Sequence, residues 1–101
     1  MEASTDGMVV AISASERIPE MERRFLAAHP GAELLWTPYV ESLEARSSKA
    51  RHGGVNADGL PTPEITDELR DAWARTQVLV GLDLPAEAAE LFPRLELLQL
   101  A

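Results

Sequence analysis

The last quarter of the chain constrains the fold more than any other part. Residues 77–85 (QVLVGLDLP) and 95–101 (LELLQLA) are two apolar runs, separated by a short stretch with helical spacing. Apolar runs without polar alternation are typical of strands buried on both faces, as in a parallel sheet. The second run reaches Ala101 without a polar or glycine-rich exit, so we expect the chain to be a piece of a longer protein.

The first part of the chain repeats the same pattern. An apolar run at 8–12 (MVVAI) is followed by a helix that Pro19 can begin and that residues 29–31 (HPG) can end, and then by a second run at 32–37. Before the third run, Thr62 to Glu64 is a helix start, and an apolar stripe follows at Ile65, Leu69 and Trp73. We therefore predict an α/β parallel sheet with right-handed crossovers and strands near 8–12, 32–37, 77–82 and 95–100.

Composition excludes several kinds of site. The 101 residues contain no cysteine, which removes disulfides, thiolate metal sites and cysteine nucleophiles and suits a reducing, cytoplasmic compartment. Seventeen acidic and nine basic side chains give a net charge of −8, which opposes nucleic-acid binding. The sequence has no apolar run of the length that a membrane span needs, and its first residues, 1–7, are polar and expected to be disordered.

The middle of the chain, residues 38–61, has no sustained period, and long irregular segments of this kind are either functional or disordered. A short helix at 40–46 is compatible with the sequence. Residues 46–52 (RSSKARH) then gather three of the nine basic side chains. This segment is either an anion-attracting flap beside a carboxylate or phosphate substrate, or a solvated mobile loop.

Ligands of open α/β sheets lie beyond the carboxyl ends of the strands. This rule selects Ser13–Ser15, Thr37–Tyr39, Gly81–Asp83 and whatever follows Ala101. Gly81 either allows a ligand to approach the backbone or supplies an unusual backbone angle, or it is a simple turn glycine. Asp83 is also placed to cap the short helix at 85–91.

Other polar residues carry less chemistry. His29 and His52 are expected to be exposed loop side chains, and no cluster with metal-ligand spacing surrounds either of them. The acidic pair Glu41 and Glu44 is expected to lie on a solvated helix face. Trp36 and Trp73 are expected to be core or half-buried packing residues.

The succession of units from residue 66 onward resembles a known family. Residues 66–85 (TDELRDAWARTQVLVGLDLP) and 91–101 (LFPRLELLQLA) are similar to the N-terminal part of the D-isomer-specific 2-hydroxyacid dehydrogenases. In that family a helix leads to a strand ending in glycine, then to a short helical unit and another strand, and then to a Gly-Ala-Gly turn. No single short motif carries the resemblance; the order of the units does.

The resemblance implies a flavodoxin-like parallel sheet with helices on both faces, incomplete in this chain, in which residues 8–101 are the N-terminal portion of a substrate-binding domain. It also implies that the first strand lies between the second and the third. The whole enzyme would use NAD or NADP, act on a small 2-hydroxy or 2-keto acid and form a homodimer. Gly81, Leu82, Asp83 and Ala101 are the expected substrate-binding residues of this chain.

The sequence lacks the G-x-G-x-x-G dinucleotide fingerprint, and the family's catalytic arginine, glutamate and histidine belong to later segments. We therefore expect this chain alone to bind no cofactor and to catalyse no reaction. Two alternatives stay open: a stand-alone flavodoxin-like domain that binds a ligand or another protein, and a truncated gene product that binds a partner through its open sheet edge.

Overall fold

The computed structural model describes residues 7–81, 83–85 and 87–100. Its strands are β1 (Val9–Ser13), β2 (Glu33–Thr37), β3 (Val78–Gly81) and β4 (Leu97–Leu100). Its helices are α1 (Pro19–Ala28), α2 (Leu43–Arg51), α3 (Asp67–Arg75) and α4 (Ala88–Leu91). Residues 1–6 lie outside the described residues, so the expected disorder of the N-terminus stays a prediction for them. Gly7, the last residue of that expected segment, donates a hydrogen bond from its amide to the carbonyl of Gly31 at 2.9 Å.

The four strands form one sheet in the order β2-β1-β3-β4, and all three neighbouring pairs are parallel. This confirms the predicted α/β parallel sheet and the position of the first strand between the second and the third. The order is also that of the first four strands of a flavodoxin-like fold. In register, Ala11 of β1 lies opposite Leu35 of β2 and Leu79 of β3, so these small and large apolar side chains share one face.

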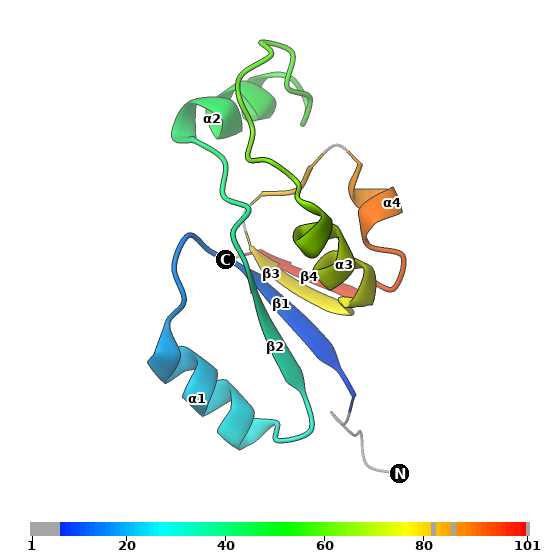
Figure 1. The fold of residues 1–101 in the computed structure, drawn as a ribbon. Helices are drawn as coiled ribbons and strands as arrows, with labels where there is room; N and C mark the ends of the chain where they lie inside the picture. Colours follow the sequence, from blue (N-terminus) through cyan, green and yellow to red (C-terminus); the bar gives the residue numbers. More distant parts are fainter. Residues whose placement is uncertain (1–6, 82, 86, 101) are drawn as a thin grey trace.

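Helices cover both faces of the sheet (Figure 1), with α1 on one face and α3 and α4 on the other. The main core lies under α3 and α4. Its centre is the ring of Trp73, whose centroid is 5.4 Å from that of Tyr39 and 4.7 Å from that of Phe92. Leu69 and Leu79 complete the packing around these rings. The apolar stripe that the sequence indicated on α3 is therefore the side of the helix that faces the sheet.

The helix boundaries follow local chemistry. Helix α1 begins with Pro19 and ends before His29, as predicted. Helix α3 begins later than predicted, because the hydroxyl of Thr66 accepts a hydrogen bond from the amide of Leu69 at 3.1 Å and so caps the helix there. Ile65 still packs against the core, from the segment just before the helix.

Residues 43–51 form helix α2. The helix that the sequence allowed at 40–46 therefore exists, but it begins three residues later and continues five residues further. Ser42 caps this helix by accepting a hydrogen bond from the amide of Ala45 at 3.1 Å. Glu44 lies in the first turn and Lys49 and Arg51 in the last, which suits the helix dipole. The helix lacks an apolar stripe because its inward side is held by polar contacts, and this explains why the sequence pattern indicated only part of it.

Candidate functional site: a charged cluster beyond the strand ends

Helix α2 stands beyond the carboxyl ends of the strands (Figure 1), the edge where open α/β sheets bind their ligands. Five side chains meet there, and we call them the charged cluster. The chain after β2 supplies two of them, α2 supplies two, and the chain after β3 supplies one. The members are Tyr39, Glu41, Arg46, Lys49 and Asp83.

Asp83 is paired with Arg46 in a fork. The Arg46 Nε donates to Oδ1 and its Nη2 to Oδ2, each at 2.9 Å, and the amide of Glu41 donates to Oδ2 at 2.9 Å. The Asp83 side chain is only 3% exposed. The hydrogen bond from Arg46 holds the pKa of Asp83 below its usual range, although burial acts in the opposite direction. Asp83 therefore joins the end of the sheet to α2 as a carboxylate.

Glu41 is buried even more completely, with a side chain that is 1% exposed. Its Oε2 accepts hydrogen bonds from Lys49 Nζ at 2.7 Å and from the hydroxyl of Tyr39 at 2.9 Å. Its other oxygen, Oε1, has no hydrogen-bond partner among the described residues. Burial, and then the hydrogen bond to Glu41, raise the pKa of Tyr39, so its hydroxyl stays a donor. A buried acceptor without a donor is rare in proteins. The Trp73 Nε1 in the core is likewise a buried polar atom without a partner among the described residues.

Two hollows flank Lys49. One of about 500 Å³ is lined by Glu41, Arg46, Lys49, Asp83 and two glycines, Gly53 and Gly54, among others. The other, of about 600 Å³, shares Lys49 and Gly54 with the first and is also lined by Tyr39, Pro63, Arg70 and Glu87, among others. Both glycines have a positive φ, 64° for Gly53 and 92° for Gly54, which a residue with a side chain rarely adopts. The two hollows therefore border the cluster, while the carboxylates of Glu41 and Asp83 are themselves almost completely buried.

Several sequence predictions change here. Asp83 does not cap α4: the structure places Glu87 at that position, and the Asp83 carboxylate instead binds Arg46 and the amide of Glu41. Residues 46–51 belong to helix α2 and not to a loop, and all three of their basic side chains lie within 4 Å of a carboxylate. Glu41 is not on a solvated face; burial beside Lys49 overrides its polarity. The only signal that could have found it is the spacing of Arg46 and Lys49, which places two cations on one face of a helix.

Gly81, one of the expected substrate-binding residues, is buried at the carboxyl end of β3. A Cβ atom added there would lie 2.9 Å from the Cβ of Ser13 on β1. Its φ is not positive, so the unusual backbone angle considered above is wrong, and the close approach of β1 accounts for the glycine. The hydroxyl of Ser13 forms a hydrogen bond with the hydroxyl of Thr37, with 3.2 Å between the two oxygen atoms. Leu82 and Ala101 were also expected to bind the substrate, and both lie outside the described residues.

The histidines lie away from the charged cluster's carboxylates. His29 follows α1 and its ring lies 5.2 Å from that of Phe25, while His52 follows α2 with its Nε2 3.7 Å from Asp58. Within residues 7–81, 83–85 and 87–100, no three acidic or histidine side chains gather as a metal site would require. In the same residues, no helix has the length and apolar character that crossing a membrane demands.

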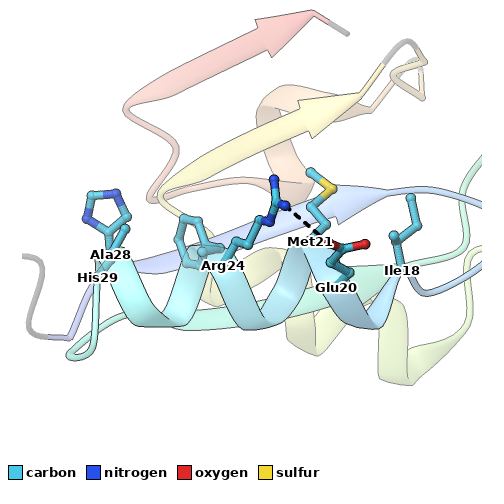
Figure 2. A pocket seen from close by; sticks show the side chains of 7 residues that line it. Ile18, Glu20, Met21, Arg24, Ala28 and His29 are labelled. Atoms are coloured by element: carbon cyan, nitrogen blue, oxygen red, sulfur yellow. Dashed lines mark ion pairs between the residues drawn. The ribbon is translucent and has the colours of Figure 1, made fainter.

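A further hollow of about 600 Å³ runs along one side of α1 (Figure 2). Its lining includes the apolar residues Ile18, Met21 and Phe25, and the ion pair between Glu20 and Arg24 at 3.2 Å crosses it. Both members of that pair are more than 60% exposed. The hollow offers apolar surface but no buried polar group, so its chemistry is poorer than that of the charged cluster.

Comparison with known proteins adds no relative to these observations. The chain matches no protein-family model, and neither the curated proteins nor the solved structures contain a significant match to it.

Proposed function

We propose that this chain is the N-terminal part of the substrate-binding domain of an NAD(P)-dependent oxidoreductase that acts on D-2-hydroxy acids or 2-keto acids. The observation that carries the proposal is the strand order β2-β1-β3-β4, which is the order that the family resemblance implies. The succession of α3, β3, α4 and β4 along the chain is also the succession of units in that family. A cytoplasmic location and a homodimeric enzyme belong to the same proposal.

In this proposal the chain supplies one wall of a substrate cleft at the carboxyl ends of the strands. Gly81 ends β3 at that edge, and Asp83 lies two positions further along the chain. Leu82 and Ala101 are assigned to the cleft from the sequence resemblance alone. Asp83 holds α2 beside the cleft through its fork with Arg46. Hydride transfer needs a nicotinamide held against the substrate, and this sequence has no dinucleotide fingerprint. The cofactor and the acid–base residues would come from later segments of the same polypeptide.

The proposal is tested on the product of the whole reading frame. We expect the coding sequence after residue 101 to continue with a Gly-Ala-Gly turn and, further on, a G-x-G-x-x-G motif. The purified product should oxidise NADH or NADPH with a panel of 2-keto acids, followed at 340 nm, and should form the D-hydroxy acid. The 101-residue chain is the matched control, and titration calorimetry should show no saturable binding of NADH to it at micromolar concentrations. A full-length product that reduces no 2-keto acid would refute the proposal.

One observation favours a second candidate, a stand-alone flavodoxin-like domain that binds another protein. The edge strand β4 exposes two large apolar side chains, Leu97 at 54% and Leu98 at 37%, and successive residues of a strand lie on opposite faces. Exposed apolar residues on an edge strand are a surface that a partner strand can cover. A reading frame that ends near residue 101, together with a stable complex in size-exclusion chromatography, would favour this candidate.

A further inference from the structure

We propose that residues 42–60, which comprise helix α2 and the turn after it, form a lid that opens as a unit over the carboxyl ends of the strands, with Arg46 and Lys49 as its latch. The lid projects beyond the sheet, and two stretches of chain without helix or strand join it to the rest of the molecule, residues 38–41 and 61–66 (Figure 1). A lid at this edge would serve any ligand that the sheet binds there. The inference therefore goes beyond the proposed function and does not depend on the reaction.

The lid is held together by bonds of its own. The hydroxyl of Ser48 on α2 donates a hydrogen bond to the carboxylate of Asp58, and the same carboxylate lies 3.7 Å from Arg51 Nη2. In the turn, the side-chain amide of Asn56 donates to the carbonyl of Leu60 at 2.8 Å, and its oxygen accepts from the amide of Leu60 at 3.1 Å. The helix and the turn can therefore move together without losing these contacts.

The lid contributes little to the hydrophobic core. Among the described residues, the apolar cluster around Trp73 includes none from the lid. Leu43 and Val55 of the lid are 74% and 61% exposed, and the fully buried residues of α2 are the small Ala45 and Ser48. Burial of an apolar face is the main force that holds most helices on their domains. Opening of the lid therefore exposes little new apolar surface and costs much less than unfolding of the sheet.

Two cations tie the lid to the rest of the molecule. Among the described residues, every side-chain hydrogen bond and ion pair between the lid and the other segments comes from Arg46 or Lys49. Arg46 binds the carboxylate of Asp83, and Lys49 binds the carboxylate of Glu41. The desolvation of buried charges offsets much of their attraction, and opening returns them to water. A small free-energy difference therefore holds the lid closed, as a part that moves requires.

The two hollows beside the charged cluster have walls from both parts. The lid lines the hollow of about 500 Å³ with Gly53 and Gly54, among others, and the chain after β3 lines it with Asp83 and Leu84. The hollow of about 600 Å³ is likewise shared between the lid, which supplies Val55, and the segments that precede α3 and α4. Movement of the lid therefore changes access to both hollows.

The test is amide hydrogen exchange, measured by mass spectrometry on the product of the whole reading frame without any ligand. We expect the amides of α2 to exchange at least about tenfold faster than those of β1, after correction for their intrinsic rates, because the lid opens while the sheet stays folded. Arg46→Met removes the fork with Asp83 and should speed the exchange of α2 by about a further tenfold, which is about 1.4 kcal/mol. Arg46→Lys keeps the charge without the fork and should give a smaller increase.

The control variant weakens the sheet and leaves the latch intact, as Val10→Ala. Val10 is 5% exposed and lies near the start of β1, away from the strand ends that the lid covers. We expect it to speed the exchange of β1 by about tenfold or more and to leave that of α2 unchanged, because opening of the lid keeps residue 10 packed.

Three results would overturn the inference: equal exchange of α2 and β1 in the wild type, exchange of α2 that Arg46→Met leaves unchanged, or exchange of α2 that rises together with that of β1 in Val10→Ala. The last result would mean that α2 exchanges only when the whole domain unfolds. A full-length product that reduces no 2-keto acid refutes the proposed function and leaves the exchange result, and with it the lid, as it stands.

Discussion

Replacing Gly81 by alanine should destabilise the fold through a contact between two strands. The new Cβ would lie 2.9 Å from the Cβ of Ser13, where ordinary contacts begin near 3.4 Å. Neither atom can turn away, because each Cβ is fixed to the backbone of its strand. The strands must therefore separate or shift, and forcing an extra methyl group into a packed interior costs about 1–3 kcal/mol. For a domain of this size, each kcal/mol lowers the melting temperature by about 4–8 °C.

A second substitution shows whether Ser13 is the cause. Ser13→Gly removes the opposing Cβ and, alone, should cost about 1–2 kcal/mol, through the weaker strand preference of glycine and the lost contact with Thr37. The double variant, Gly81→Ala with Ser13→Gly, has no clash. Its loss in free energy of unfolding should therefore be smaller, by about 1–2 kcal/mol, than the sum of the losses of the two single variants. Urea denaturation followed by circular dichroism gives all four free energies of unfolding. A loss below about 0.5 kcal/mol for Gly81→Ala, or additive losses in the cycle, would refute the reasoning.

Two further predictions follow from buried groups. Asp83→Asn should cost about 1–3 kcal/mol at pH 7, less than a fully buried pair because the Arg46 side chain is 35% exposed. The pKa of Asp83 is lowered in the folded state, so the stabilisation by this carboxylate is present above its unfolded pKa of about 3.9 and is lost as the pH falls through the folded pKa. The difference in free energy of unfolding between the wild type and Asp83→Asn, measured by urea titration, should therefore disappear below about pH 4. A difference that stays constant with pH would contradict this. Trp73→Ala should lower the free energy of unfolding by about 3–5 kcal/mol, because Trp73 lies in the core and is 1% exposed. Trp36→Phe loses one hydrogen bond to Glu22 and should lower it by about 1 kcal/mol or less. Similar losses for the two variants would contradict the assigned core.

The sequence was sufficient for the sheet, because continuous apolar runs and helix-ending residues such as Pro30 are local signals. The strand boundaries agree with the predicted ones within two residues, and the order of the strands was expected from the family resemblance. The stripe Ile65, Leu69 and Trp73 correctly identified the face that builds the core. These features depend on periodicity, which a single sequence displays directly.

The charged cluster could not be predicted in the same way. Helix α2 is held by polar contacts, so its sequence has no apolar period, and the sequence allowed only a short helix at 40–46 in a stretch that was otherwise irregular. Glu41 and Asp83 are 42 residues apart, and nothing in either segment announces that the amide of one binds the carboxylate of the other. Burial of Glu41 beside Lys49 is a tertiary effect, and so is the contact of Gly81 with Ser13.

The central position of β1 has a consequence for synthesis of the protein. Strands β1 and β2 can pair as soon as residues 9–37 have left the ribosome. The other edge of β1 pairs with β3, for example Val10 with Val78, so it stays unpaired until β3 has been made. At about 5–20 residues per second, the 44 residues between Thr37 and Gly81 take about 2–9 s to be made. During that interval an apolar strand edge stands open at the ribosome, where it can pair with a neighbouring nascent chain. We therefore expect faster translation of this middle segment to increase the soluble yield.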